Sequence, residues 1–239
     1  MKTLIFAAGR GERMRPLTDT TPKPLLSVGG KPLIVWHLER LAAAGLNEIV
    51  INCAHLADTL CAALGDGRRH GVSITWSREP AGALETAGGI AWAREALGDE
   101  PFLVINGDVW CDWNPAHAHR LAHALAERQD LAHLVLVDNP EHHTRGDFCL
   151  CDGRIRHARE DAGDAENGTD TLTYAGIGVF SPALCAGVER GQTMKLRPLL
   201  DAAIDRQRLS GERHTGRWVD VGTPERLADL DRTLRDATP

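Results

Sequence analysis

Four residues near the N-terminus have the types and spacing of an anion-binding loop. They follow the short apolar run at residues 4–6, and they are Gly9, Gly11, Arg13 and Lys23. Glycine adopts positive φ and has no side chain, so successive backbone N–H groups can turn inward around a phosphate. A forked guanidinium and a lysine ammonium suit a triphosphate better than a single carboxylate. The segment therefore predicts a site for nucleotide phosphates.

Two familiar glycine-rich phosphate motifs do not fit this loop. The dinucleotide fingerprint needs a third glycine where Met14 stands, and the Gly-Lys-Ser/Thr of a P-loop is absent. This weakens the interpretation as a cofactor-binding oxidoreductase. A lone Gly-x-Gly is more often an ordinary surface loop, so the rest of the chain must decide.

The elements that position this loop alternate along the first half of the chain. Apolar periodicity and glycine stops predict strands at residues 4–6, 48–52, 72–76 and 101–106, with helices at 32–44, 54–64 and 90–97. This β-α-β order predicts a parallel sheet with right-handed crossovers. Ligands then bind at the carboxyl ends of the strands.

Two further candidates lie at those strand ends. Asp108 follows the most apolar strand; Asn-Gly-Asp alone is a common turn, but at this place the carboxylate is a candidate magnesium ligand. Residues 77–89 are predicted to form a long loop rich in glycine and alanine. The alternative interpretation is a simple connection that contacts no ligand. Glu85 in this loop has the acceptor needed for the N3–H of a pyrimidine.

The second half of the chain predicts a polar helix at residues 115–128 and a strand at 131–137. A β-rich region follows, with an Asp-Gly hairpin turn at residues 152–153, a mobile acidic loop at 161–170 and a strand at 171–180. A helix at 195–206 comes next. We expect one domain over residues 1–239, with a nucleotide-binding half at 1–138 and a sugar-binding half at 139–239.

Charge and length limit the function classes. The chain has 239 residues, a formal charge of −6 and a pI of about 6.0, and it has no block of five basic residues. These values argue against nucleic acid or membrane partners and favour small molecules. The N-terminal apolar run is too short for a signal peptide, so we expect a cytoplasmic protein, monomeric or a small homo-oligomer.

Cysteine and histidine patterns give no metal or disulfide framework. The six cysteines show no C-x-x-C spacing, and we expect all of them to be free thiols. His119 and His123 have helical i,i+4 spacing, but the Glu of an H-E-x-x-H motif is missing. A solvated helix face is therefore favoured over a zinc site.

Taken together, the N-terminal motifs resemble the signature of the sugar-nucleotide pyrophosphorylases, which join a nucleoside triphosphate to a sugar 1-phosphate. The matching segments are Ala8-Gly9-x-Gly11-x-Arg13-Met14-x-Pro16-Leu17-Thr18, Pro22-Lys23-Pro24-Leu25-Leu26 and Lys31-Pro32. The resemblance covers nearly the whole chain. It implies a nucleotide-diphospho-sugar transferase fold: a Rossmann-like, mixed but mostly parallel sheet flanked by helices, with a small β-rich sugar-binding insertion.

The resemblance also implies roles for individual residues. Arg13 would contact the β- and γ-phosphates and Lys23 the region of the α-phosphate. The remaining nucleotide contacts would come from Ala8, Gly9, Gly11, Glu12, Glu85, Thr86 and Gly88. Asp108 and Asp220, the latter in a Trp-x-Asp-x-Gly-Thr-Pro motif, would hold Mg²⁺. That motif is also a sound turn and helix N-cap, formed by Thr223 and Pro224.

The sugar contacts implied in the same way are Asn106, Asp147, Gly176 and Lys195. The chain lacks the Glu-Lys-Pro that many relatives use to bind the sugar phosphate. Several of its segments are most similar to the uridylyltransferases that act on N-acetylmuramate 1-phosphate in peptidoglycan recycling. Lys195, Arg145 and Arg197 are then candidates for holding the lactyl carboxylate of that sugar.

Three alternative functions remain open at this point. The chain could transfer a guanylyl group to mannose 1-phosphate or a thymidylyl group to glucose 1-phosphate. It could also be a silent sugar-nucleotide sensor, but such a chain should have lost Lys23 or a metal carboxylate, and this one keeps them.

Overall fold

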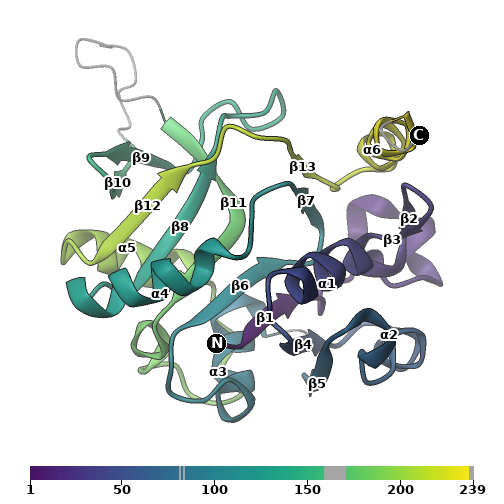
Figure 1. The fold of residues 1–239 in the computed structure, drawn as a ribbon, viewed down its shortest axis with the longest axis horizontal. Coiled ribbons are helices and arrows are strands. Elements are labelled where there is room, and N and C mark those ends of the chain that lie inside the picture. The colour runs from purple at the N-terminus through teal and green to yellow at the C-terminus, as the bar shows by residue number, and fades with distance from the viewer. Residues whose placement is uncertain (81, 83, 159–170, 237–239) are drawn as a thin grey trace.

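A single mixed sheet runs through the molecule. The computed structural model describes residues 1–80, 82, 84–158 and 171–236. Within them, nine strands form one sheet in the order β5-β4-β1-β6-β11-β8-β12-β10-β9, and helices cover both of its faces (Figure 1). The loop expected at residues 161–170 lies outside the described residues.

The first half of the chain forms the parallel part of this sheet. Its elements are β1 (Thr3–Phe6), α1 (Leu33–Ala43), β4 (Glu48–Cys53), α2 (Ala57–Leu64), β5 (Ser73–Arg78), α3 (Glu85–Leu97) and β6 (Phe102–Asn106). β1 pairs in parallel with both β4 and β6, and β4 pairs in parallel with β5. The predicted parallel sheet is confirmed, and Gly45, with φ +76°, follows α1 as expected.

The second half extends the sheet with strands of both directions. Its elements are α4 (His117–Arg128), β8 (Ala132–Val137), β9 (Phe148–Cys151), β10 (Arg154–His157), β11 (Thr171–Phe180), α5 (Arg197–Asp205) and β12 (Leu209–Arg213). β11 lies antiparallel between β6 and β8, whereas β12 is parallel to β8. The sheet is therefore mixed. β12 is an element that the sequence pattern does not predict.

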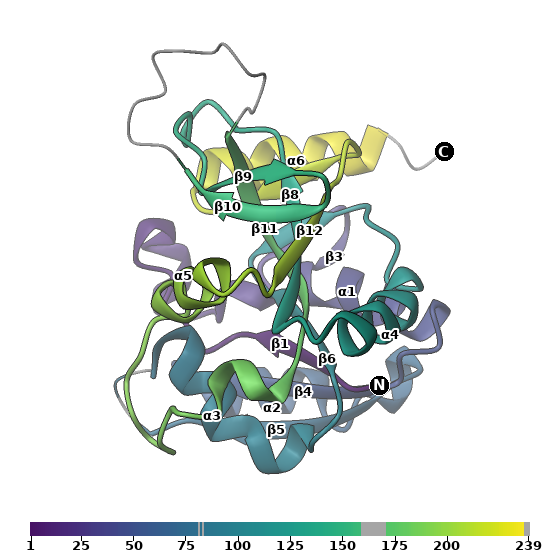
Figure 2. The ribbon, with the colours of Figure 1, turned by 90° about the vertical axis from the view of Figure 1, so that its left-hand side faces the viewer.

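The predicted Asp-Gly hairpin is confirmed. Asp152 and Gly153 join β9 to β10 with φ values of +49° and +73°, which is the type I′ pattern that Asp-Gly favours. The hairpin lies at the edge of the sheet, where Figure 2 shows it above α5.

The core has two main layers, one on each side of the sheet. Successive residues of a strand point to opposite faces, so Ile5 packs on the side of α1, α2 and α4 while Leu4 packs on the side of α3 and α5. Both side chains are fully buried. No helix within the described ranges is long and apolar enough to span a membrane.

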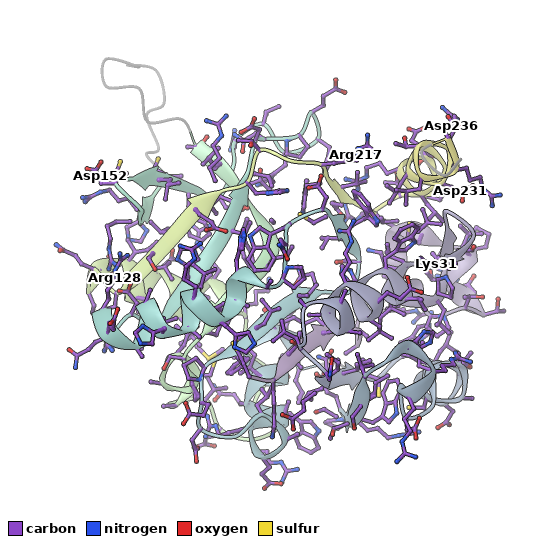
Figure 3. All side chains as sticks on the ribbon, viewed as in Figure 1. Lys31, Arg128, Asp152, Arg217, Asp231 and Asp236 are labelled. Atoms are coloured by element: carbon purple, nitrogen blue, oxygen red, sulfur yellow. The ribbon has the colours of Figure 1, made fainter. Side chains whose placement is uncertain are left out.

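A smaller third cluster joins the two ends of the chain. It lies between the hairpin of β2 (Ser27–Val28) and β3 (Lys31–Pro32) and the last helix, α6 (Pro224–Asp236). Asp231 accepts a 2.8 Å hydrogen bond from the backbone N–H of Gly29, and Figure 3 labels Asp231 on α6 and Lys31 on the hairpin. The C-terminal helix therefore supports the segment that follows the glycine loop.

Candidate active site

A cavity of about 540 Å³ opens at the carboxyl ends of β1, β4 and β6. Its wall combines the glycine loop, charged side chains from the first half of the chain and the start of α3. The lining residues predicted from the sequence are Ala8, Gly9, Gly11, Glu12, Arg13, Lys23, Glu85, Thr86, Asn106 and Asp108. The fold rule for parallel sheets thus places these residues together at one edge.

The loop takes the conformation that its glycines allow. Gly11 has φ +68°, and a Cβ there would lie 3.0 Å from Thr18 Cγ2. The carbonyl of Gly11 accepts a 2.9 Å hydrogen bond from the Thr18 hydroxyl. Gly9 has open space where a Cβ would stand. The loop backbone is therefore fixed at Gly11 and accessible to a ligand at Gly9.

A buried polar network behind the loop was not found from the sequence. Asn52 is only 2% exposed; its Oδ1 accepts a hydrogen bond from Ala7 N–H at 2.7 Å, and its Nδ2 donates to Glu79 Oε1 at 2.6 Å. Glu79 Oε2 accepts from Leu84 N–H at 3.0 Å. Hydrogen bonds to a charged group contribute about 1.5–3 kcal/mol each. The network thus holds the glycine loop against the start of α3.

The segment expected to be a loop at residues 77–89 is partly helical. α3 begins at Glu85 rather than near residue 90, because Gly88 and Gly89 allow close packing instead of breaking the helix. A Cβ at Gly88 would overlap Gln192 O, and one at Gly89 would lie 2.8 Å from Glu79 Oε1. The Gly88 N–H donates to Met194 O at 3.1 Å.

Gly88, which the sequence analysis expected to contact the nucleotide, therefore packs against another segment of the chain. Gly88 is buried against the 192–194 segment and is not among the residues that line the cavity. Glu85 and Thr86 do line it, and Glu85 is exposed with φ +61°. The wall that faces the cavity is thus formed by the first residues of α3.

A second cavity of about 300 Å³ adjoins the first. Arg13, Asn106 and Asp108 line both of them. The other residues of its wall come from the second half of the chain, except for one at the start of β7 (Val109–Cys111), and they are Val109, Pro140, His142, His143, Thr173, Tyr174, Gly176, Trp218 and Asp220. The site therefore has two ends that meet at three shared residues.

Asp108 and Asp220 reach the second cavity from neighbouring backbone segments. β7 pairs antiparallel with β13 (Trp218–Asp220), and Val109 is the register partner of Asp220. The carbonyl of Asp108 accepts a 2.9 Å hydrogen bond from Val221 N–H. Two carboxylates that are far apart in sequence are thus placed side by side by a short ribbon, which we call the β7–β13 ribbon.

Each carboxylate accepts a hydrogen bond from a cationic side chain. Asp108 Oδ2 accepts from Lys23 Nζ at 2.6 Å, and the Lys23 side chain is almost buried. Asp220 Oδ2 accepts from Arg226 Nη1 at 2.9 Å and lies 3.5 Å from His142 Nε2. Arg226 and His142 also contact each other. Neither Oδ1 atom has a protein partner in the part of the chain that the structure describes, so each carboxylate keeps one free oxygen.

Gly222 explains how two guanidiniums reach this place. A Cβ at Gly222 would overlap Arg226 Nη2 and lie 3.0 Å from Arg13 Nη2. Glycine in the Trp-x-Asp-x-Gly-Thr-Pro motif therefore leaves room for Arg226 and Arg13 beside Asp220. The helix cap expected in this motif is present, since Thr223 Oγ1 accepts from Arg226 N–H at 3.4 Å and Pro224 begins α6.

Asn106 and Gly176, both predicted from the sequence to contact the sugar, lie together in the wall of the second cavity. Gly176 has φ +74° at an irregularity in the β11–β8 pairing, and a Cβ there would lie 2.7 Å from Asn106 Nδ2. Tyr174 also lines this cavity. Its buried hydroxyl has no partner among the described residues, and burial raises its pKa, so it is a neutral donor.

Asp147 lies behind this wall rather than in it. Its Oδ2 accepts from Tyr174 N–H at 2.8 Å, and its Oδ1 lies 3.1 Å from His143 Nε2. The carboxylate thus positions two residues that do line the cavity, but it is not itself a lining residue. The sequence pattern identified the region but not this indirect placement.

The three basic candidates for the lactyl carboxylate are not in the walls of these cavities. Lys195 and Arg145 are exposed, and neither lines the cavities described above. Arg197 pairs with Asp201 at 2.8 Å, and its guanidinium stacks on the Phe148 ring at 4.6 Å. The sequence analysis missed His142 and His143, which line the second cavity, and Arg226, which contacts Asp220.

The pair of aspartates fits a hard divalent cation. Mg²⁺ prefers carboxylate oxygens together with phosphate and water oxygens, and the free oxygens of Asp108 and Asp220 belong to one cavity wall. Lys23 and Arg226 already neutralise the other two oxygens. The residues that could hold such an ion are therefore Asp108 and Asp220.

Comparison with known proteins gives matches along nearly the whole chain. An N-acetylmuramate alpha-1-phosphate uridylyltransferase of Neisseria meningitidis is 53% identical over 230 residues, which cover 96% of each chain. A protein of the same name from Caulobacter vibrioides is 35% identical, with 98% of this chain and 97% of the relative covered.

The fold has solved counterparts as well. A Bacillus anthracis protein assigned as a glucose-1-phosphate thymidylyltransferase, solved with sucrose, superposes with a TM-score of 0.81 at 22% identity. The match covers 99% of this chain and 96% of that one, and it supports the expected sugar-nucleotide transferase fold. The model of the nucleotidyl transferase family matches residues 2–147. The chain belongs to the nucleotidyl transferase family.

Proposed function

We propose that the protein transfers a uridylyl group from UTP to N-acetyl-α-D-muramate 1-phosphate, giving UDP-N-acetylmuramate and pyrophosphate. The observation that carries this proposal is the 53% identity over 96% of both chains to a protein with that name. The two adjoining cavities support it, because the reaction needs one place for a nucleoside triphosphate and one for a sugar phosphate. A cytoplasmic location is part of the same proposal.

The reaction needs positioning and charge neutralisation rather than a protein nucleophile. An oxygen of the sugar 1-phosphate attacks the α-phosphorus of UTP, and the bond between that phosphorus and the oxygen that bridges it to the β-phosphate breaks. Pyrophosphate then leaves with both electrons of the broken bond. The attacking oxygen is already anionic, so placing two anions together is the main difficulty.

The residues shared by both cavities address that difficulty. Arg13 lines both ends and is assigned to the β- and γ-phosphates, where its fork suits two phosphate oxygens. Lys23 is assigned to the α-phosphate region; it is 8% exposed, and a buried ammonium is a strong partner for an anion. Asn106 is assigned to the sugar phosphate side.

Magnesium is part of this proposal. Asp108 and Asp220 would hold the ion, which when bound neutralises phosphate charge and polarises phosphoryl oxygens. Lys23 and Arg226 hold the two carboxylates in place through hydrogen bonds of 2.6 and 2.9 Å. These hydrogen bonds therefore hold both aspartates in position before substrates arrive.

A grid of four nucleoside triphosphates and several sugar 1-phosphates tests the proposal, with pyrophosphate release as the measurement. We expect UTP with N-acetylmuramate 1-phosphate to give the highest kcat/KM. A tenfold preference for GTP with mannose 1-phosphate would overturn the assignment of base and sugar. Binding of UTP without any turnover across the grid would instead indicate a sensor.

A further inference from the structure

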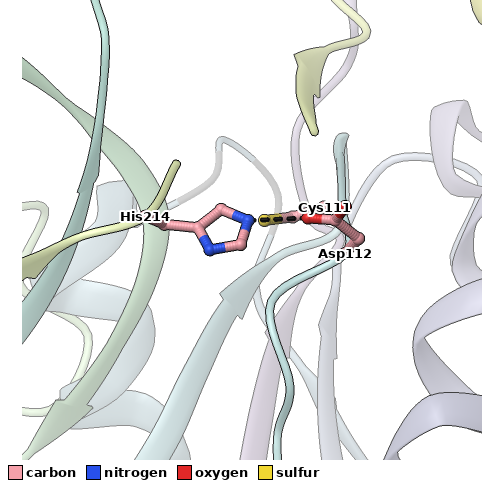
Figure 4. Close-up of side chains that lie close together, drawn as sticks. All are labelled: Cys111, Asp112 and His214. Carbon is pink, nitrogen blue, oxygen red and sulfur yellow. Dashed lines mark hydrogen bonds and ion pairs between the residues drawn. The ribbon is translucent and has the colours of Figure 1, made fainter. Parts of the chain in front are cut away.

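A cysteine, an aspartate and a histidine meet at the end of the β7–β13 ribbon. Cys111 Sγ, a carboxylate oxygen of Asp112 and a ring nitrogen of His214 all lie within 4.8 Å of one another. His214 Nε2 lies 2.7 Å from Asp112 Oδ1, although the two residues are 102 positions apart. Figure 4 shows the His214 ring pointing toward the other two side chains. None of the three lines either cavity of the candidate active site.

Backbone hydrogen bonds hold the cluster from both sides. Cys111 is the register partner of Trp218 in the ribbon, and Asp112 N–H donates to Arg217 O at 3.0 Å. His214 N–H donates to Leu136 O at 2.7 Å, directly after β12. The three side chains are therefore brought together by ordered backbone rather than by a flexible surface loop.

A glycine packs directly against the two polar side chains of the cluster. Gly216 is exposed, and a Cβ on it would overlap Asp112 Oδ1 and lie 2.6 Å from His214 Nε2. Any other residue would place its side chain on the two polar atoms. Glycine therefore allows the backbone to pass this close to the Asp112 carboxylate and the His214 ring.

We propose that Cys111, Asp112 and His214 form a zinc site, distinct from the aspartate pair assigned to magnesium. One thiolate, one imidazole and one carboxylate form a ligand set that suits Zn²⁺, whereas Mg²⁺ requires oxygen ligands. Three protein ligands leave the fourth tetrahedral position to water, which can arrive from solvent because the Asp112 side chain is 41% exposed. Binding releases the proton of the Cys111 thiol to solvent.

Only small side-chain movements separate the present arrangement from a tetrahedral one. Bond lengths of about 2.0–2.3 Å imply ligand atoms roughly 3.3–3.8 Å apart. The His214–Asp112 pair at 2.7 Å must open slightly, and the more distant atoms must close in from at most 4.8 Å. The positive charge of Arg40 acts on both Cys111 and Asp112, and it opposes the binding of a cation there. We therefore expect weaker binding than in sites with four protein ligands.

The site lies where an ion would stabilise the ribbon. β7 ends at Cys111 and is followed by Asp112, and Asp108 precedes the other end of the strand. His214 belongs to the connection between β12 and β13, which leads to Asp220. A bound ion would join these two segments. Zinc is therefore expected to raise the melting temperature of the chain without taking part in the transfer reaction.

The test uses the full chain after removal of metals with a chelator, and it uses Co²⁺ and Zn²⁺ alone as probes. Excess Mg²⁺ is present throughout to occupy oxygen-ligand sites. We expect one equivalent of Co²⁺ to give a thiolate-to-cobalt charge-transfer band, which Zn²⁺ then displaces. Cys111→Ser should abolish the band. Because loss of even an outer partner costs about 10–100-fold in affinity, His214→Gln should weaken Zn²⁺ binding by at least about 100-fold.

Matched controls separate this site from other thiols and histidines. Cys61→Ser changes a half-buried thiol on α2, and His119→Gln changes the exposed histidine pair on α4; both should keep the band and the zinc affinity. Near-ultraviolet circular dichroism without metal checks that each variant is folded. Absence of the band in the unchanged chain, or its survival in folded Cys111→Ser, would overturn the proposal. So would unchanged zinc affinity in folded His214→Gln.

Discussion

The two ends of the candidate site are built in different ways. The nucleotide end is the larger cavity, to which the nucleoside triphosphate is assigned. It consists mainly of one continuous segment, residues 7–24, together with the ends of parallel strands and the start of α3. The sugar end consists of side chains from separated segments that antiparallel pairing and the β7–β13 ribbon bring together. A loop built from one segment leaves its pattern in the sequence, whereas a wall built from several segments does not.

This difference also separates the kinds of group that each end presents. The nucleotide end offers glycine and alanine backbone with the charges of Arg13 and Lys23, which suits any nucleoside triphosphate. The sugar end presents the side chains of His142 and His143, which are groups that can discriminate between sugars. The first end is therefore expected to determine the common chemistry of the family and the second the choice of acceptor.

The largest effect is expected at the two aspartates assigned to magnesium, of which Asp108 lines both cavities. Asp108→Asn and Asp220→Asn should each lower kcat by on the order of 10²–10³, the usual effect of removing one group that stabilises charge in a transition state. If both carboxylates hold one Mg²⁺, the double variant should be little worse than either single one. Turnover at several Mg²⁺ concentrations measures this.

Thermal melting is the control for these variants, because each aspartate also receives a hydrogen bond from a cation. The melting temperature should change little in comparison with turnover. A single variant with near-normal turnover at limiting Mg²⁺, or losses that simply multiply, would show that the two aspartates do not share the ion. The two ends would then lack a common centre.

The second prediction concerns the stability of the ribbon at the sugar end. His37 on α1 is buried, and its Nε2 lies 2.8 Å from Val109 O, the first residue of β7. Burial is the main cause that lowers the pKa of His37 from 6.5 to about 4; the hydrogen bond with Val109 opposes it, the charge of Arg40 acts with it, and the charge of Asp108 opposes it. The unfolded chain therefore binds this proton more readily than the folded chain does.

Stability should accordingly fall as pH decreases from about 6.5 to about 4, by up to about 3 kcal/mol from this group, with no further contribution below that window. Denaturant unfolding at a series of pH values measures the slope. His37→Gln keeps a donor for Val109 O and removes the titration, so its curve should be flatter in this window. An equal slope in both proteins would assign the acid sensitivity to other groups.

The contrast between the ends explains how much the sequence could predict. The parallel half of the sheet, the glycine loop and the Asp152-Gly153 hairpin depend on local periodicity and turn residues, and the structure has them where the sequence placed them. The expected loop at residues 77–89 was too long because Gly88 and Gly89 appeared as loop residues. Both glycines lie inside α3, where the lack of a side chain allows close tertiary packing.

What the sequence could not predict depends on pairing between distant segments. Asn52 and Glu79 lie at the ends of neighbouring strands, and buried polar residues there were a usable but neglected signal. His142 and Arg226 contact Asp220 only in the tertiary fold, so no sequence spacing predicts these contacts. Six free thiols were expected and are confirmed, but the meeting of Cys111 with His214 left no local pattern.

The third prediction tests whether the sugar end selects the acceptor. His142 lines the second cavity, whereas Lys195, which the sequence favoured for the lactyl carboxylate, does not. A hydrogen bond to a carboxylate contributes about 1.5–3 kcal/mol, so His142→Leu, which removes the donor, should lower kcat/KM for N-acetylmuramate 1-phosphate by roughly 10–100-fold. The loss on N-acetylglucosamine 1-phosphate should be smaller, and the KM for UTP should hardly change.

Lys195→Met is the matched control, since it removes an exposed cation outside both cavities. It should leave both sugars nearly unaffected. A larger and muramate-specific loss in Lys195→Met than in His142→Leu would return the carboxylate contact to Lys195. It would also show that the acceptor extends beyond the cavity in this structure.

The smallest effect is expected at the base, where the nucleotide end must distinguish pyrimidines. Glu85 lines the large cavity, and its carboxylate can accept the N3–H of uracil, whereas N3 of cytosine is itself an acceptor and would be repelled. Glu85→Gln offers a donor as well as an acceptor and keeps the same side-chain length at φ +61°. The preference for UTP over CTP should therefore fall by roughly tenfold, because one such hydrogen bond contributes about 1 kcal/mol or slightly more. The ratio of kcat/KM for the two nucleotides, measured with a saturating sugar phosphate, gives this number.

Thr86→Ser, which changes the neighbouring wall residue but keeps its hydroxyl, should leave the ratio unchanged. If Glu85→Gln also leaves it unchanged, the base is read by other groups, and the nucleotide end recognises only phosphates at the residues assigned here.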